Sequence, residues 1–322
     1  MSIRPRIILP RIILLIAITL VATTFQLSAL AQQGWSQAQI FKQGGKEATV
    51  NAVSYNGDEI WVVGADGLVA RSYDDGRNFE KIDLNVDAGL NDVFVRKDDV
   101  WIVGDAGTIL LSTDGGKSFQ QSRGTGTSKT IDLYSVQFTD GERGYIVGDE
   151  GLILTSSNGG FSWREQRSGT DAQLFHLSFQ DERGWVVGTG GVILHTDDGG
   201  RNWYPQRSGT SDDLNRVYLI TDEVGLVTGD NGALLRTENG GATWQRVRLR
   251  TTSPLFGMSF IDKKTGWVVG YKGQIIRTYD GGRNWVEQES GTNADLFSVS
   301  FYKNRGYAIG RDGLIMKYYE KR

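Results

Sequence analysis

The chain has no cysteine, four prolines and two histidines among its 322 residues. Without cysteine it has no disulfide, no thiol nucleophile and no thiolate metal site. His176 and His195 are too few for a histidine-based metal or acid–base centre, so we expect no cofactor and no bound metal. Few prolines beside 43 glycines favour many tight turns over a disordered linker.

The sequence also lacks a large charge of one sign, since its formal net charge is −3. Residues 1–31 have the pattern of a secretory signal peptide: three arginines, an uncharged apolar run, and small residues at Ala29 and Ala31 before Gln32. Cleavage would bring the net charge to about −6, which argues against nucleic-acid binding. The alternative is an uncleaved membrane anchor, but the apolar run is short for a span of roughly 20 residues.

Seven copies of one phrase run along the chain, each an apolar run ending in glycine, two further residues and a second glycine. Their first glycines are 40, 44, 40, 41, 41 and 40 residues apart. Such a period, made of short strands and turns, is typical of a β-propeller with one blade per copy. The first glycines are Gly64, Gly104, Gly148, Gly188, Gly229, Gly270 and Gly310.

The fourth copy contains the four strands expected of one blade. The inner strand is expected at 174–179, the second at 184–188, the third at 192–196 and the outer strand at 203–207. We therefore predict one all-β domain, 32–322, that forms a seven-bladed propeller of four-stranded antiparallel blades. The blades are placed roughly at 48–83, 88–122, 131–167, 172–207, 212–248, 253–289 and 294–320 plus 34–42.

An octet, Ser/Thr-x-Asp/Asn-x-Gly-x-x-Trp/Phe, lies between the third and fourth strands of six copies. Its Asp or Asn can hold the turn through its own backbone, its glycine permits a positive φ, and its aromatic ring packs on neighbouring strands. These acids and amides are therefore predicted to hold turns rather than to catalyse a reaction. They are Asp74, Asp114, Asn158, Asp198, Asn239 and Asp280.

The seventh copy ends without an octet and without a fourth strand. The segment that begins at Trp35 resembles the outer strands that begin at Trp203 and Trp285. We therefore expect residues 34–42 to complete the last blade, which closes the ring and removes an unpaired edge.

These octets, joined to Gly-Trp-Val-Val-Gly phrases at 184–188 and 266–270, resemble the photosystem II assembly and stability factor family. The resemblance covers essentially all of residues 35–320. It implies a non-enzymatic propeller that binds an unassembled photosystem II reaction-centre subunit or its precursor. It also implies export to the thylakoid lumen or periplasm, and a monomer that is at most peripheral to the membrane.

Five arginines in the connections between blades are expected to form an arc on one rim. Guanidinium groups suit carboxylates on a partner, and the family resemblance implies an arginine patch for the client protein. The alternative is one arginine copied by duplication, which bonds neighbouring carbonyls or Asp132, Asp171 and Asp213. The arc consists of Arg123, Arg167, Arg207, Arg248 and Arg250.

Similar octets occur in sialidases and some glycoside hydrolases, so an exported glycan-binding or glycan-hydrolysing propeller is the alternative function. Hydrolysis of this kind needs two carboxylates that face each other. Apolar and amide residues are expected to face the central channel instead, which suggests a plugged or narrow channel and no enzyme. They are Asn51, Asn91, Tyr134, Phe175, Asn215, Phe256 and Phe297, while His195 is expected at the surface.

Overall fold

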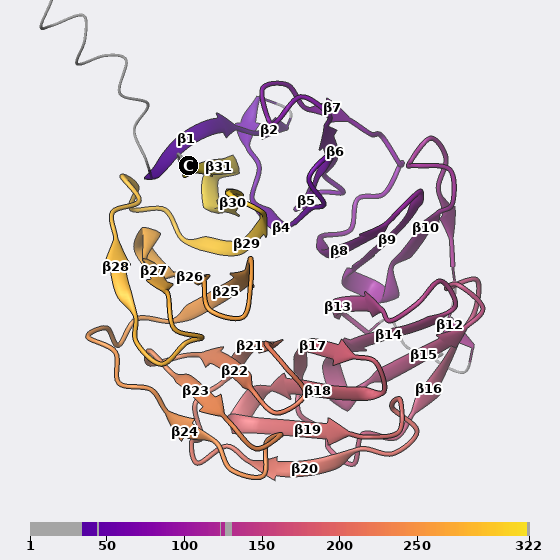
Figure 1. The fold of residues 1–322 in the computed structure, drawn as a ribbon. Coiled ribbons are helices and arrows are strands. Elements are labelled where there is room, and N and C mark those ends of the chain that lie inside the picture. The colour runs from indigo at the N-terminus through magenta and orange to yellow at the C-terminus, as the bar shows by residue number, and fades with distance from the viewer. Residues whose placement is uncertain (1–33, 44, 123, 126–130, 321–322) are drawn as a thin grey trace, which may run out of the picture.

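The computed structural model describes residues 34–43, 45–122, 124–125 and 131–320. The predicted signal peptide and Arg123 lie outside the described residues. Seven antiparallel sheets surround a central axis, each with its first strand innermost (Figure 1). This arrangement confirms the predicted seven-bladed propeller. No helix in the described ranges is long and apolar enough to cross a membrane.

Blades one to four follow the chain from the axis outward. Blade one has β4 (Val50–Tyr55), β5 (Ile60–Gly64), β6 (Val69–Ser72) and β7 (Glu80–Lys81). Blade two has β8 (Leu90–Arg96), β9 (Asp99–Gly104), β10 (Ile109–Ser112) and β11 (Gln120–Gln121). Blade three has β13 (Leu133–Phe138), β14 (Arg143–Gly148), β15 (Ile153–Ser157) and β16 (Trp163–Gln166), with β12 (Gly124–Thr125) parallel to β16. Blade four has β17 (Leu174–Gln180), β18 (Arg183–Gly188), β19 (Val192–Thr196) and β20 (Tyr204–Arg207).

The remaining blades repeat this order until the ring closes. Blade five has β21 (Leu214–Leu219), β22 (Gly225–Gly229), β23 (Leu234–Thr237) and β24 (Gln245–Arg246). Blade six has β25 (Leu255–Phe260), β26 (Gly266–Gly270), β27 (Ile275–Thr278) and β28 (Val286–Gln288). Blade seven has β29 (Leu296–Tyr302), β30 (Arg305–Gly310), β31 (Leu314–Tyr319) and β1 (Gly34–Ile40), and the hairpin β2 (Lys42–Gln43) and β3 (Lys46–Glu47) leads into blade one. Short 3₁₀ turns join second to third strands at η1 (Asp105–Gly107), η2 (Asp149–Gly151), η3 (Thr189–Gly191), η4 (Tyr271–Gly273) and η5 (Arg311–Gly313).

The octet turns are held by their own side chains. In blade six, Thr278 Oγ1 accepts the Gly282 N–H at 2.9 Å and donates to Asp280 Oδ1 at 2.9 Å. The same Asp280 oxygen accepts the Asn284 N–H at 2.9 Å. Gly282 has a φ of +82°, a conformation that side chains rarely adopt. These hydrogen bonds satisfy the buried polar groups of the turn locally.

Each octet turn also packs against the blade before it. The indole N–H of Trp101 in β9 donates to the Gly159 carbonyl of the blade-three octet at 2.9 Å. The Tyr145 hydroxyl in β14 donates to the Gly199 carbonyl of the blade-four octet at 2.7 Å. The octets therefore join neighbouring blades as well as reversing the chain.

The ring closes as expected, because β1 pairs with β31 in antiparallel register. Trp35 and Trp267 both donate their indole N–H to Gln288 Oε1, at 3.2 and 3.0 Å. In blades four and five, Trp185 and Trp244 share Gln206 Oε1 in the same way, at 3.0 Å each. Trp35 thus takes the place of an octet tryptophan in the blade whose own octet is missing.

Candidate functional site

Of the arginines in the predicted arc, Arg167 and Arg207 lie on the rim that carries the 3₁₀ turns. The start of β19 pairs with the end of β20, so Arg207 lies beside the turn η3, and Arg167 follows β16 at the equivalent place. Arg167, Arg207, Arg248 and Arg250 are exposed. None of these four makes a hydrogen bond or ion pair with another described side chain, so their guanidinium groups are available to a partner.

Two of the three aspartates considered as partners for these arginines, Asp132 and Asp213, accept hydrogen bonds from neighbouring blades instead. Asp132 Oδ1 accepts the Ala106 N–H of the blade-two turn at 2.8 Å. Asp213 Oδ1 accepts the Gly190 N–H of the blade-four turn at 2.8 Å. These two carboxylates join one blade to the next, and they form no ion pair with the described arginines of the arc.

The structure concentrates positive charge between blades five and six. Three adjoining hollows, of about 460, 470 and 350 Å³, follow the outer strands β24 and β28. The first two share Arg248, and the last two share Arg250 and Glu287. We name these hollows the blade 5–6 groove. Six cationic and two acidic side chains line it: Arg236, Arg246, Arg248, Arg250, Lys272 and Arg283, with Glu238 and Glu287.

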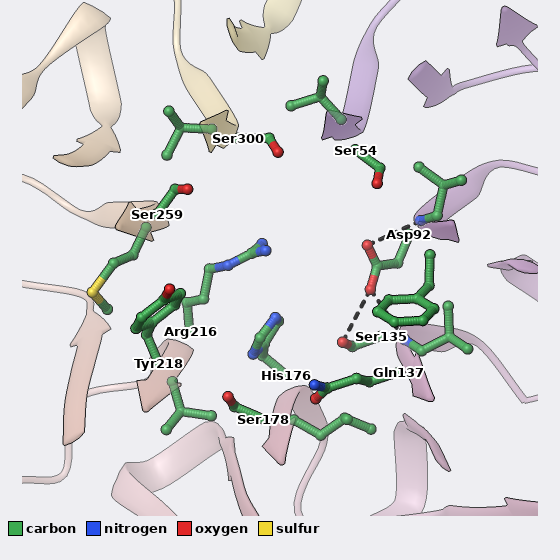
Figure 2. A pocket seen from close by; sticks show the side chains of 18 residues that line it. Ser54, Asp92, Ser135, Gln137, His176, Ser178, Arg216, Tyr218, Ser259 and Ser300 are labelled. Carbon is green, nitrogen blue, oxygen red and sulfur yellow. Dashed lines mark hydrogen bonds between the residues drawn. The ribbon is translucent and has the colours of Figure 1, made fainter. Parts of the chain in front are cut away.

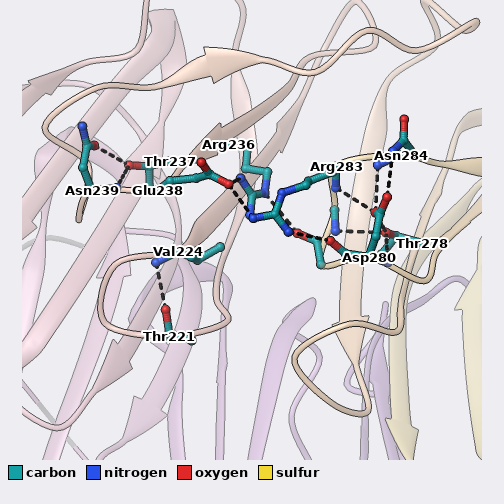
Figure 3. A network of polar contacts seen from close by, with 12 residues as sticks. Thr221, Val224, Arg236, Thr237, Glu238, Asn239, Thr278, Asp280, Arg283 and Asn284 are labelled. Carbon is teal, nitrogen blue, oxygen red and sulfur yellow. Dashed lines mark hydrogen bonds and ion pairs between the residues drawn. The ribbon is translucent and has the colours of Figure 1, made fainter.

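Three of the cations in the groove are already held by the protein. Figure 3 shows Glu238 between Arg236 and Arg283, and its carboxylate accepts from Arg283 at 2.8 Å. The hydrogen bond from Arg236 is the main cause that lowers the pKa of Glu238, so the carboxylate stays ionised. Arg246 donates to Asp212 at 3.0 Å. The charge that remains for a ligand is therefore that of Arg248, Arg250 and Lys272.

The groove also offers apolar surface. Val286 is 60% exposed, and Trp285 and Leu249 are partly buried beside the core of blades five and six. The segment after β24 alternates between arginine and apolar residues, so Val247 and Leu249 pack inward while the arginines stay at the surface. An extended chain carrying both carboxylates and apolar side chains fits such a surface.

Residues expected to line the channel lie at its mouth and join the blades. The amide of Asn91 donates to Asp105 Oδ1 at 2.8 Å and to the Leu133 carbonyl of the next blade at 3.0 Å. The Tyr134 hydroxyl donates to Asp149 Oδ1 at 2.8 Å. Rim carboxylates such as Asp105 and Asp149 are thus part of the structure of the mouth.

The interior of the channel differs from the expected apolar lining. All seven inner strands shift register after their first residue, which places a bulge at the positions expected to face the axis. The residues that follow the bulge line the channel instead. Among them are Asp92, His176 and Arg216, from blades two, four and five (Figure 2). The expectation that apolar and amide residues line the channel was wrong at this depth, because the bulge moves the alternation by one residue.

Burial changes the ionisation of these three side chains. Burial raises the pKa of Asp92 and lowers the pKa of Arg216. Burial and the charge of Arg216 together hold the pKa of His176 well below its usual value. His176 is therefore neutral at physiological pH. No group of three His, Asp or Glu side chains in the described ranges is placed to hold a metal ion.

The expectation that His195 lies at the surface was wrong, because its side chain is mostly buried. Its side chain is 12% exposed, and its ring lies on Trp185 with centroids 4.3 Å apart. The equivalent Arg277 lies over Trp267 at 4.4 Å. The position packs against the aromatic residue of the second strand, which the sequence pattern alone does not reveal.

Comparison with known proteins identifies the family. A model described as "Photosynthesis system II assembly factor YCF48" matches residues 86–157, 155–255 and 241–321. No curated protein matches the chain. The solved YCF48 of Cyanidioschyzon merolae is 20% identical, with a TM-score of 0.74 over 89% of this chain and 98% of that one. A structure titled "YCF48 bound to D1 peptide" is 19% identical, with a TM-score of 0.76 over 91% and 97%.

Other propellers share the fold. A virginiamycin B lyase from Staphylococcus aureus with quinupristin is 12% identical, with a TM-score of 0.77 over 89% of this chain and 100% of that one. Because such identities establish only a common fold, the family assignment depends on the family model, which spans most of the chain. It confirms the resemblance read from the octets and the Gly-Trp-Val-Val-Gly phrases. The chain belongs to the Photosynthesis system II assembly factor YCF48 family.

Proposed function

We propose that this protein is a non-enzymatic assembly factor that binds an unassembled photosystem II reaction-centre subunit through the rim carrying Arg167, Arg207, Arg248 and Arg250. Family membership and a related YCF48 bound to a D1 peptide support the role. The observation that carries the site is the set of four exposed arginines without partners among the described residues. Arg123, which lies outside those residues, belongs to the same proposed arc.

The blade 5–6 groove is the proposed centre of the contact. Arg248 and Arg250 are two residues apart and line all three hollows between them. Their charges would attract carboxylates of an extended client segment, while Val286 and Trp285 would contact its apolar side chains. We further propose that the protein is exported to the thylakoid lumen or the periplasm, where such a segment is accessible.

The alternative of a glycan-hydrolysing propeller has less support. Cleavage by the usual route needs two carboxyl groups across the scissile bond. Among the described residues that line the channel, Asp92 is the one carboxylate. A function in binding rather than catalysis therefore agrees better with the geometry.

The experiment compares two double variants with equal changes in charge. Arg248→Gln/Arg250→Gln removes two of the three free cations of the groove, and Arg77→Gln/Arg201→Gln removes two exposed arginines from the octet rim. Binding of a fluorescent D1 peptide is measured by anisotropy at low and at physiological salt. We expect the groove variant to bind at least about tenfold more weakly and the control variant to bind normally.

Two further outcomes decide between the role and the site. Equal loss in both variants would mean that binding follows net charge, which contradicts the proposed groove. Failure of the unmodified protein to bind the peptide or to retain reaction-centre subunits from its own membranes would contradict the role itself.

A further inference from the structure

The central channel contains a cation with no direct partner. Arg216 extends from β21 into a cavity of about 220 Å³ enclosed by the seven inner strands (Figure 2). Its guanidinium carries five N–H donors. It makes no hydrogen bond and no ion pair with any residue that the structure describes. Buried guanidinium groups usually have such partners, so this one is available to a ligand.

The single carboxylate of the cavity is already occupied on its own wall. Asp92 accepts hydrogen bonds from the Ser135 hydroxyl at 3.1 Å and from the Val136 and Val93 N–H groups at 3.0 Å each. Figure 2 shows Asp92 and Arg216 on facing sides of the channel. Asp92 therefore makes the electrostatic potential of the channel more negative, but it forms no ion pair with Arg216.

Two serines of the channel have free hydroxyl donors. Ser259 Oγ accepts the Phe301 N–H at 3.1 Å, and Ser300 Oγ accepts the Tyr55 N–H at 3.1 Å. Each hydroxyl keeps its own hydrogen for a further bond. In addition, His176 Nδ1 is buried and has no partner among the described residues. The unused groups of the channel are thus mostly donors, next to one positive charge.

We propose that the central channel binds a small carboxylic acid as its carboxylate, with Arg216 donating to both carboxylate oxygens and Ser259 or Ser300 adding a hydroxyl bond. The planar fork of a guanidinium matches a carboxylate in this way. The cavity is smaller than the roughly 300–1,000 Å³ of pockets for drug-sized ligands, so it suits an acid of a few heavy atoms. This site lies inside the ring and does not depend on the groove or on the proposed function.

The test is calorimetric titration of the purified protein with acetate, malonate and succinate. Acetamide serves as the uncharged analogue and sulfate as a tetrahedral anion. We expect saturable binding of at least one carboxylate and none of acetamide. Arg216→Gln should weaken binding at least about tenfold, Arg216→Lys should retain part of it, and Arg201→Gln, at an exposed arginine of the octet rim, should bind as the unmodified protein does.

Thermal unfolding and far-ultraviolet circular dichroism show whether each variant is folded. If Arg216→Gln does not fold, Ser300→Ala and Ser259→Ala replace it, with an expected weakening of several-fold. A crystal structure with malonate should place the ligand on Arg216. Absence of saturable carboxylate binding, equal binding by Arg216→Gln, or binding of sulfate as tight as that of every carboxylate would overturn the proposal.

Discussion

Replacing Trp35 with alanine tests whether the N-terminal strand closes the ring. Trp35 packs edge-on against Phe301 with centroids 5.7 Å apart and against Tyr318 at 5.2 Å, and it donates to Gln288 at 3.2 Å. Each ring pair contributes about 1 kcal/mol, and so does the hydrogen bond. We therefore expect Trp35→Ala to lower the free energy of unfolding by about 3 kcal/mol, near the lower limit for loss of a buried tryptophan, because Trp35 is only partly buried.

The assay is thermal unfolding followed by circular dichroism. In a ring of this size, 1 kcal/mol corresponds to about 2 °C, so Tm should fall by about 6 °C. The Trp35→Phe variant keeps the ring contacts and loses the indole donor, so its Tm should fall by about 2 °C. Tyr204→Ala is the control, since this outer-strand side chain is 58% exposed and its loss should change Tm little.

The weakened closure should also expose the edge of β31. An unpaired strand edge promotes pairing with other chains, so Trp35→Ala should show concentration-dependent association in gel filtration. A Tm within 1 °C of the unmodified protein, with no association, would refute the view that β1 stabilises the ring at this position.

Two further predictions concern the octets. Gly160→Ala should destabilise the protein by about 2–4 kcal/mol in urea unfolding, because φ is +84° and the new Cβ would lie 2.6 Å from Trp101 Nε1. The control Gly169→Ala, with φ of +80° and no atom within 4 Å of the new Cβ, should lower the free energy of unfolding by only about 1 kcal/mol. Equal losses in the two variants would contradict a role of Gly160 in the contact between blades. The hydrogen bond from the Asn78 N–H is the main cause that lowers the pKa of Asp74 to about 2. The stability that this carboxylate contributes is therefore present above its ordinary pKa near 4 and is lost as pH falls through about 2. The double variant Asp74→Asn/Asn78→Ser copies the Asn158 and Ser162 pair of blade three. Its free energy of unfolding should depend less on pH between pH 4 and pH 2 than that of the unmodified protein. An unchanged pH dependence would show that other groups cause the loss of stability in acid.

The sequence was sufficient for the architecture because each blade is specified locally. The spacing of Gly64, Gly104 and their equivalents marks the turns, and the octets mark the reversal into the outer strand. Even the ring closure was predictable, since Trp35 begins a segment that resembles the outer strands of other blades. Alternation and turn chemistry are local properties, so a single sequence reveals them.

Only the tertiary structure determined the surroundings of the individual side chains. A bulge in every inner strand placed Asp92, His176 and Arg216 inside the channel, and no local pattern shows which residues a bulge leaves facing the axis. The groove beside Arg248 and Arg250 exists because the ring places the outer regions of blades five and six next to each other. Repeats specify how each blade is built, whereas the charges and cavities between blades depend on the residues that the ring brings face to face.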